Sequence, residues 1–399
     1  MQLAREARAF SVRLGLFYGA LFVIYGMHVP YFPVWLDGRG LSADQISAIM
    51  AAPFFLRLLV TPATALAADR SGHHRSYLIA LAWASLAMVS LLSGMQGFWS
   101  LLAFSVPLSL AFSTIMPLTE TVAVSGVRHA GLDYGRMRLW GSLTFIAASF
   151  AGGFAIEHWG NAAGIWLVAF GCLLTVAAAH CLPRTMLGHD PPSPDAAPWW
   201  KASEPLMLLR QPAFLTFLVA AGCNQAAHAT FLTFGTLIWH KQGLTGEWIG
   251  TLWAIGVLAE VGLFAVSGWL VRTFGATWLL LAGATASVIR WIAMGFDPGF
   301  ALLLPLQILH GVTYGAVHIG AIHFIGKAVP VRQAGSAQAL YATVASGVAM
   351  GAATLIAGRL YAIDATVAYF AMAAIAAVAL IAAWLLHRIW RGEAILSAP

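Results

Sequence analysis

The chain has 399 residues, of which 60% are hydrophobic and only 9% are charged. Soluble domains carry roughly 25% charged residues, so this composition excludes a soluble globular protein and indicates a polytopic α-helical membrane protein. The net charge of +6 does not indicate a nucleic-acid-binding surface, because most Lys and Arg residues fall in alternate loops and at the two termini. This asymmetry follows the positive-inside rule and predicts that both termini are cytoplasmic.

Hydropathy predicts twelve membrane-spanning helices, because each apolar segment is about 20 residues long or longer. A polar, proline-rich stretch over residues 183–210 separates six spans from six, as a cytoplasmic linker between two domains (1–182 and 211–399) would. The predicted spans cover residues 10–36, 42–68, 76–95, 98–126, 135–156, 161–182, 211–238, 244–272, 276–296, 299–327, 333–361 and 365–390.

The sequence of the first half of the chain is repeated in the second half, in a register that aligns residue 40 with residue 243. Gly40–Ser42 before the second span corresponds to Gly243–Thr245 before the eighth, and Asp69–Gly72 corresponds to Arg272–Gly275. Two parallel repeats of six spans resemble the plan of the major facilitator superfamily, over nearly the whole chain. The resemblance implies an all-α fold of two pseudo-symmetric six-helix bundles, with a solute site at the midplane between the halves.

The loop after the second span resembles that superfamily's signature between its second and third helices. It contains Asp69, Arg70, Gly72 and Arg75, although Ala65 stands where the signature usually has glycine. A tight glycine turn, charges at helix ends and basic residues can latch neighbouring helix ends together. We expect a structural or gating role for these residues rather than solute contact, because the motif lies in a loop and not at the midplane.

The segment Leu132–Ser142 resembles the start of the fifth helix in lactose permease-like proton symporters and, more closely, in the phenylpropionate permease family. Glu120 precedes Arg138 at the spacing at which the lactose permease pattern has an acid and an arginine on adjacent helices. Arg138 by itself would serve as a positive-inside anchor. Glu120 lies in an apolar run and needs a partner, so we predict a Glu120–Arg138 ion pair facing a cavity.

The second half carries an acid, an arginine and a histidine on three different predicted spans: Glu260, Arg290 and His310. Their local sequences resemble the phenylpropionate permeases, and lactose permeases have the same three residue types at corresponding places. Lactose permeases add a carboxylate one turn after the histidine, where this chain has Thr313. A transported proton must therefore be carried by Glu260, His310 or Glu120, and the alternative for Glu260 and Arg290 is a static strut between helices.

The tenth predicted span is mostly apolar yet polar along one side. Gln307, His310, Tyr314 and His318 share a helical face, which predicts a functional surface, whereas a single histidine would more often bond a backbone carbonyl. A small-xxx-small pair, which lets another helix approach closely, lies on a neighbouring stripe: Gly311 and Gly315.

Further polar residues in the predicted spans would complete a solute cavity. They are Tyr25 in the first span, Asn224 and His228 on one face of the seventh, and Gln338 in the eleventh. A single polar residue of this kind more often forms a hydrogen bond between two helices than a solute contact. Arg57 has no acid within one helical turn, so it would snorkel, pair with an acid on another helix or bind a substrate carboxylate.

These features predict a secondary transporter that imports a small organic solute together with protons by alternating access. The family resemblance implies an aromatic monocarboxylate such as 3-phenylpropionate, a bacterial inner-membrane location, a functional monomer, and no cofactor or metal. A proton symporter of a neutral sugar or nucleoside is the alternative. A membrane-embedded enzyme is disfavoured because the chain lacks HExxH and GxSxG motifs, and an ATP-driven pump because it lacks a Walker A motif.

Overall fold

The computed structural model describes residues 2–183, 203–330 and 333–396. The regular elements of these residues are helices, and eleven of them are long and apolar enough to cross a membrane. The predicted all-α membrane fold is therefore confirmed. Most of the predicted linker lies outside the described residues, so the division into domains 1–182 and 211–399 stays a prediction.

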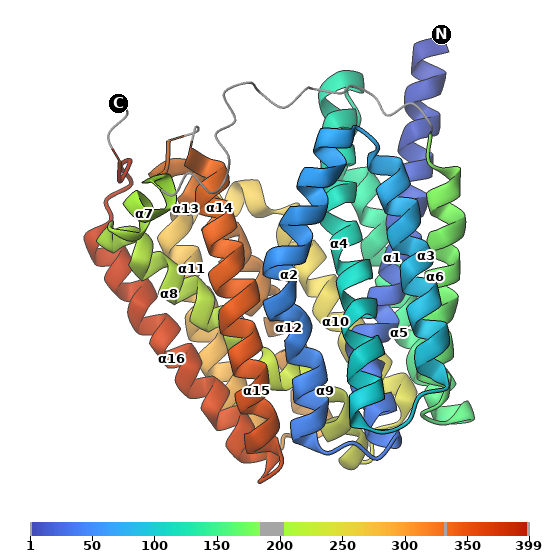
Figure 1. The fold of residues 1–399 in the computed structure, drawn as a ribbon. Helices are drawn as coiled ribbons and strands as arrows, with labels where there is room; N and C mark the ends of the chain where they lie inside the picture. Colours follow the sequence, from blue (N-terminus) through green and yellow to red (C-terminus); the bar gives the residue numbers. More distant parts are fainter. Residues whose placement is uncertain (1, 184–202, 331–332, 397–399) are drawn as a thin grey trace. The chain divides into compact units, whose positions relative to one another are not determined.

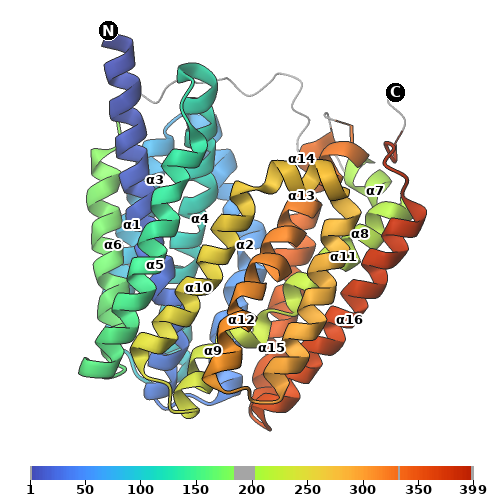
Figure 2. The ribbon, with the colours of Figure 1, turned by 180° about the vertical axis from the view of Figure 1, so that it is seen from behind.

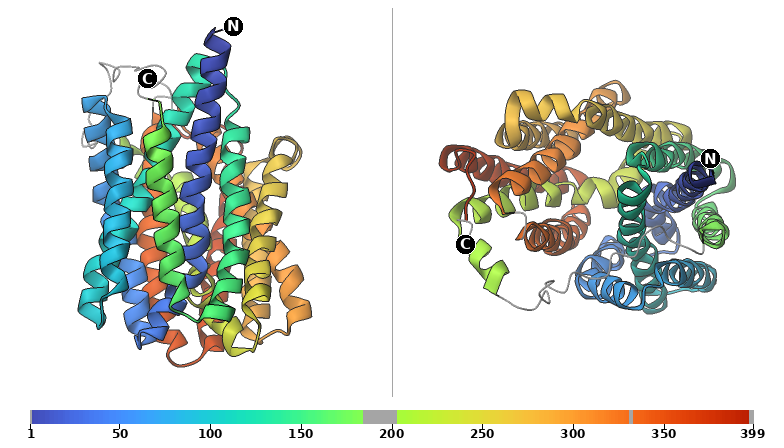
Figure 3. Two further views of the ribbon diagram at one scale, coloured as in Figure 1. Left: turned by 90° about the vertical axis from the view of Figure 1, so that its right-hand side faces the viewer. Right: turned by 90° about the horizontal axis from the view of Figure 1, so that it is seen from above.

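The first compact unit consists of residues 1–196 together with residues 239–254. Within it, α1 packs along α5 and α6, while α4 packs against α2 and α3 (Figures 1 and 3). Its long helices are α1 (Gln2–Gly38), α2 (Ala43–Ser71), α3 (His74–Ser93), α4 (Phe98–Ala130), α5 (Tyr134–Trp159) and α6 (Ala163–Cys181).

The second compact unit consists of residues 197–238 together with residues 255–399. Here α16 packs along both α8 and α11, and α13 packs against α11 (Figure 2). Its elements include α7 (Ser203–Leu209), α8 (Pro212–Ala226), α11 (Ser267–Gly295), α12 (Phe300–His310), α13 (Val317–Ala328), α14 (Ala334–Tyr341), α15 (Met350–Tyr361) and α16 (Ala365–Ile389). Residues of both units contribute to α9 (Ala229–Lys241) and α10 (Gly246–Ala265).

The internal repeat is visible in the backbone conformation of matched glycines. Gly40 and Gly243 have φ angles of 80° and 84°, and Gly72 and Gly275 have φ angles of 71° and 78°. Residues with side chains rarely adopt this left-handed region, so glycine is favoured at each of these turns. The repeat predicted from the sequence therefore extends to a positive φ at all four glycines, although ψ differs within the second pair, at 6° for Gly72 and 171° for Gly275.

The turn after α2 has the features expected of a latch between helix ends. Gly72 caps α2, with its N–H bonded to the carbonyl of Ala68. The Arg75 side chain donates to two carbonyl groups at the end of α6, those of His180 and Leu182, at 2.9 Å each. On the same turn, His74 Nε2 lies 2.8 Å from Asp69 Oδ1.

The seventh predicted span differs from the expected continuous helix, because it is interrupted at Ala227 and His228 between α8 and α9. The backbone N–H of His228 bonds to the carbonyl of Gln225, while the carbonyl of Asn224 accepts from His228 Nδ1 at 2.9 Å. The imidazole thus takes the acceptor that the backbone of a regular helix would use. Each resulting segment is too short to count among the eleven spanning helices.

The tenth and eleventh predicted spans each contain a π-helical stretch, where a regular helix was expected. These stretches are η1 (Gly311–Ala316), between α12 and α13, and η3 (Ala342–Ala349), between α14 and α15. A π-helical turn holds more residues than an α-helical turn, so side chains beyond it are rotated about the helix axis. The stretch η1 lies within the polar face of the tenth predicted span. We call the four residues of this face, Gln307, His310, Tyr314 and His318, the polar ladder.

Candidate proton and solute site

Arg290, on α11, lies in the interior of the second unit with 0% of its surface exposed. Its Nη1 donates to His310 Nδ1 at 3.1 Å and to Thr313 Oγ1 at 3.3 Å, and its Nη2 donates to Gln307 Oε1 at 3.0 Å. Two aromatic rings also face the guanidinium, with centroids 4.7 and 4.5 Å from its carbon. The hydrogen-bond acceptors of this buried cation are all neutral, so its charge must be compensated by groups farther away.

These residues and their partners form a cluster, joined by hydrogen bonds and by one longer electrostatic contact to Glu260, that we call the Arg290 network. Its members come from α8, α10, α11, α12 and η1, together with the break between α8 and α9: Asn224, His228, Glu260, Ser287, Arg290, Gln307, His310 and Thr313.

His310 connects Arg290 to Glu260 through two edges of its ring. Because Nδ1 accepts an N–H from Arg290, the proton of the neutral ring lies on Nε2. That Nε2 lies 3.8 Å from Glu260 Oε2, a distance for electrostatic attraction but too long for a hydrogen bond. The structure thus brings together the three ionisable residues singled out in the sequence, with the imidazole between the guanidinium and the carboxylate.

Thr313, which stands where lactose permeases have a carboxylate, is the centre of the network. Its Oγ1 accepts from Arg290 and lies 3.1 Å from His228 Nε2, and its carbonyl accepts from Asn224 Nδ2 at 2.8 Å. Since His228 Nδ1 donates to a backbone carbonyl, Nε2 accepts and the threonine hydroxyl donates to it. Asn224 Oδ1 in turn accepts from Ser287 Oγ at 2.8 Å. The network therefore joins α8, α11 and η1 through neutral side chains.

The remaining residues of the polar ladder stack on His310. The rings of His310 and Tyr314 have centroids 5.6 Å apart at 13°, and those of Tyr314 and His318 are 6.3 Å apart at 2°. Gln307 instead bonds Arg290 and is fully buried. The predicted face thus divides into a charged end at Arg290 and an aromatic ladder of three nearly parallel rings.

The close packing of α10 against η1 brings Glu260 toward His310. A methyl group added to Gly311 would lie 2.8 Å from the carbonyl oxygen of Ala259, and one added to Gly315 would lie 3.7 Å from Glu260 Cγ. Only glycine allows the backbones this close at Gly311. The predicted small-xxx-small pair therefore contacts α10, the helix that carries the carboxylate.

The first unit contains a second charged cluster, with Glu120 on α4 and Arg138 on α5. Arg138 Nε lies 3.9 Å from Glu120 Oε1, and the Tyr134 hydroxyl donates to Glu120 Oε2 at 2.7 Å. The Arg138 guanidinium also lies on the ring of Phe22, 4.1 Å from its centroid. The predicted ion pair is present, with both side chains about 30% exposed.

Aromatic rings continue along α1 from this cluster. Tyr25 contacts Phe22 and Phe112, with a centroid distance of 5.3 Å to each. Arg57, on α2, lies over the ring of Phe54 at 4.8 Å. Tyr25, Phe22 and Arg57 are all half-buried, so this part of the first unit offers aromatic surface beside two arginines.

The structure does not bring every predicted residue into one of the two clusters. Gln338 is exposed on α14, and neither cluster includes it. Among the described residues, no three His, Cys, Asp or Glu side chains lie close enough together to hold a metal ion. Sequence reasoning did not select Ser287 or Tyr134, and it noted Thr313 only as a departure. Their proximity in sequence to Arg290, Arg138 and His310 is a weak signal, because it does not identify the distant partners His228 and Glu120.

A multi-pass, all-helical chain with an internal repeat and charged side chains held within its helices has the construction of a secondary transporter. The MFS_1 like family matches residues 11–372, and the chain belongs to this family.

Relatives of known sequence agree with this membership. The chain is 31% identical to an Escherichia coli (strain K12) protein named "Probable 3-phenylpropionic acid transporter", covering 87% of this chain and 90% of that protein. It is 30% identical to the maltose permease of Geobacillus stearothermophilus, covering 86% of each chain. These relatives are transporters and not enzymes, and this protein is likewise a transporter.

Solved structures agree on the fold. The crystal structure of the nucleoside transporter NupG matches with a TM-score of 0.80 at 15% identity, covering 96% of this chain and 100% of that one. A bacterial homologue of the human lysosomal transporter Spinster matches with a TM-score of 0.74 at 13% identity, covering 96% and 97%. The chain therefore has the major facilitator fold.

Proposed function

We propose that the protein is a proton-coupled symporter that imports a small organic solute across the bacterial inner membrane by alternating access. The observation that carries this proposal is the position of His310 between Arg290 and Glu260. A carboxylate near a cation binds a proton when the cation moves away and releases it when the cation returns. Glu260 is the proposed proton carrier, Arg290 and His310 control its charge, and Glu120 is the second candidate acid.

The proposed solute is an aromatic monocarboxylate such as 3-phenylpropionate. The relative named for this compound supports the assignment, as do Arg57 and Arg138, which lie beside aromatic rings in the first unit. A guanidinium binds a carboxylate with two parallel hydrogen bonds, and aromatic side chains pack on an aromatic ring. The proposed solute ligands are Tyr25, Arg57, Arg138, Asn224, His228, Tyr314, His318 and Gln338.

Two of these ligands are bonded within the protein. Asn224 and His228 are each 1% exposed, and their side-chain polar atoms bond to other residues of the second unit. Contact with a solute requires those hydrogen bonds to open, so solute binding would change the hydrogen bonding of the second unit.

The turn containing Asp69, Arg70, Gly72 and Arg75 has a proposed gating role, because the Arg75 side chain bonds it to the end of α6.

Uptake of the solute is expected to be electroneutral. One proton moving with one monoanion transfers no net charge, so a pH gradient should drive uptake of 3-phenylpropionate into proteoliposomes and the membrane potential should not. A neutral solute moving with one proton would instead gain about 2.3 kcal/mol per 100 mV. Uptake of labelled 3-phenylpropionate, measured with the pH gradient and the potential imposed separately, checks this expectation.

A proton symporter of a neutral sugar or nucleoside is the second candidate, supported by the 30% identity to the maltose permease. An inward current on adding maltose, lactose or a nucleoside, together with no response to 3-phenylpropionate, would assign the protein to this second class.

Both termini and the loop that contains Ser193 are expected to be cytoplasmic, from the distribution of Lys and Arg. Ser193 lies outside the described residues. In intact cells a cysteine introduced by Ser193→Cys should not react with a membrane-impermeant maleimide. Ile363→Cys, in the 73% exposed position before α16 on the predicted outer side, is the matched control and should react. Rapid labelling at Ser193 with none at Ile363 would reverse the orientation.

A further inference from the structure

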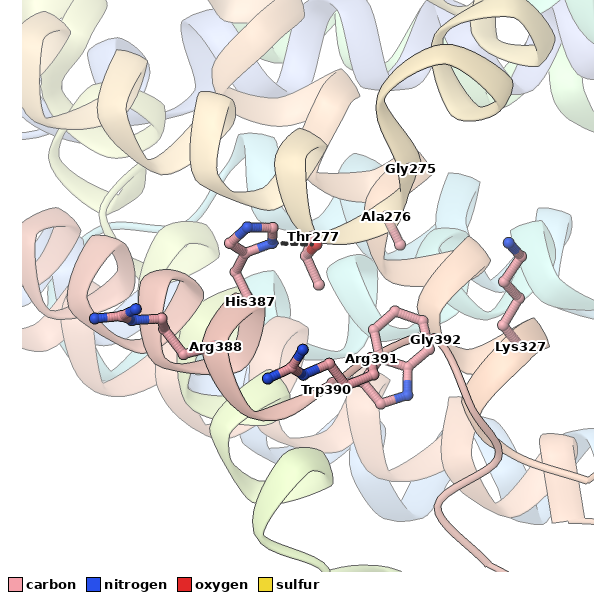
Figure 4. Close-up of a pocket in the computed structure, with 9 residues that line it drawn as sticks. All are labelled: Gly275, Ala276, Thr277, Lys327, His387, Arg388, Trp390, Arg391 and Gly392. Carbon is pink, nitrogen blue, oxygen red and sulfur yellow. Dashed lines mark hydrogen bonds between the residues drawn. The ribbon is translucent and has the colours of Figure 1, made fainter.

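A basic cavity of about 500 Å³ lies at one end of the second unit, where α11, α13 and α16 meet (Figure 4). Lys327 at the end of α13 forms one wall, and His387 and Arg388 at the end of α16 form another. Arg391, just after α16, also lines the cavity. Neither the substrate proposal nor the proton proposal uses these residues.

The lining of this cavity carries three permanent positive charges, those of Lys327, Arg388 and Arg391, and none of its lining residues is acidic. Glu393 lies two residues after Arg391, and its Oε1 accepts from the Arg391 backbone N–H at 3.5 Å and not from the guanidinium. His387 Nδ1 lies 2.9 Å from Thr277 Oγ1, which fixes the ring at the edge of the cavity. The cavity is therefore suited to an anion.

An apolar groove of about 530 Å³ adjoins the basic cavity, and His387 lines both. The groove runs between α11, α12 and α16. Its lining residues on α11 recur at helical spacing and so form one face: Trp278, Leu281, Ala282, Thr285, Ala286 and Ile289. Leu309 and Trp384 complete it. The apolar groove would not contribute to binding a water-soluble anion, whereas a hydrocarbon chain can bury its surface there.

The dimensions of the groove match one leaflet of a bilayer. From Trp278 to Ile289 the helix rises about 16 Å at ~1.5 Å per residue, roughly half of the ~30 Å hydrocarbon core. Trp278 and Trp384 are 55% and 47% exposed at the end nearest the basic cavity. Tryptophan at such a position is typical of the boundary between head groups and hydrocarbon.

We propose that the cavity and the groove together bind one anionic phospholipid. Lys327 and Arg391 hold the phosphate of the head group, and one acyl chain lies in the groove between α11 and α16. The Arg388 guanidinium lies over the ring of Trp384, 4.9 Å from its centroid, and adds positive charge beside the groove. The basic residues supply the charge complementarity, and the adjoining groove distinguishes a lipid from free phosphate. The site lies within the second unit and does not depend on which solute the protein transports.

The test is photolabelling of the purified full-length chain with phosphatidylglycerol that carries a photoreactive group in its acyl chain. Labelled peptides are expected to come from Trp278–Ile289 and from the region of Trp384. Arg391→Gln removes one head-group contact and should raise the half-saturating lipid concentration about fivefold, the factor for one basic residue near a membrane surface. Ala282→Trp fills the groove at an exposed position and should also weaken labelling by about fivefold or more, since extra bulk in an occupied site costs roughly 1–3 kcal/mol.

Matched controls remove the same charge or add the same ring elsewhere. Arg359→Gln, on the exposed last turn of α15, and Ala80→Trp, on the exposed face of α3, should leave labelling unchanged. Equal labelling of the parent, Arg391→Gln and Ala282→Trp would overturn the proposal. Block of labelling by millimolar inorganic phosphate would also overturn it, because the cavity would then be a site for soluble phosphate.

Discussion

Replacing Glu260 with glutamine is expected to abolish solute accumulation driven by a pH gradient while leaving exchange of solute across the membrane intact. One pH unit is worth about 1.4 kcal/mol per proton, so one-to-one symport can accumulate solute about tenfold. Glutamine keeps the size of Glu260 and its place beside His310, but it cannot bind and release a proton. In Glu260→Gln proteoliposomes the accumulation ratio should therefore fall to about 1, with counterflow exchange within about twofold of the parent.

Glu247→Gln is the matched control, because Glu247 lies in the first turn of the same helix, where its carboxylate is 3.8 Å from His158 Nδ1. This variant should accumulate solute like the parent. If Glu260→Gln also accumulates solute like the parent, Glu260 does not carry the proton, and Glu120→Gln is the next variant to measure.

Thr313→Val is expected to destabilise the second unit and to reduce accumulation. Valine has nearly the shape of threonine but lacks the hydroxyl group that accepts from Arg290 and bonds His228. A buried polar group left without its partner costs roughly 1–3 kcal/mol, so we expect a loss of about 2 kcal/mol, or a factor of ~30 in the population of the intact network. The melting temperature in detergent and the pH-driven accumulation ratio should both fall.

Thr313→Ser keeps the hydroxyl group and is the matched control for this loss. It should restore accumulation to within about fourfold of the parent, since the missing buried methyl group is worth about 0.8 kcal/mol, against the loss of about 2 kcal/mol expected for the hydroxyl group. A Thr313→Val protein that melts and accumulates solute like the parent would show that the hydroxyl group does not support the position of Arg290.

Much of the fold could be predicted from the sequence, because a bilayer demands long apolar helices and short loops. The glycines at 40, 72, 243 and 275 also marked their turns correctly, since each has a positive φ, which residues with side chains rarely adopt. The break at Ala227–His228 and the π-helical stretch η1 could not be predicted in this way. Both depend on which donor reaches a particular carbonyl group, and hydropathy does not record that competition.

The charged residues of the candidate site could be predicted from the sequence, but most of its neutral residues could not. Glu260, Arg290 and His310 stand out because ionisable side chains in apolar spans require partners. Thr313 does not stand out, because a threonine in a helix ordinarily bonds its own backbone. Its role depends on His228 arriving from a distant segment, and only the folded chain brings the two together. Tyr134 was hidden for the same reason, as its partner Glu120 lies on another helix.

The interruption at His228 and the π-helical stretch η1 have a mechanical consequence, because they are bonded to each other. Regular helices are stiff, and sharp bends occur where the ladder of backbone hydrogen bonds is broken. Two weak points lie side by side here, connected through Thr313 to His228 and to Asn224. Neither helix can bend at its weak point without straining or breaking those bonds. The two therefore behave as coupled hinges, and the bonds at Thr313 set the force needed to move them.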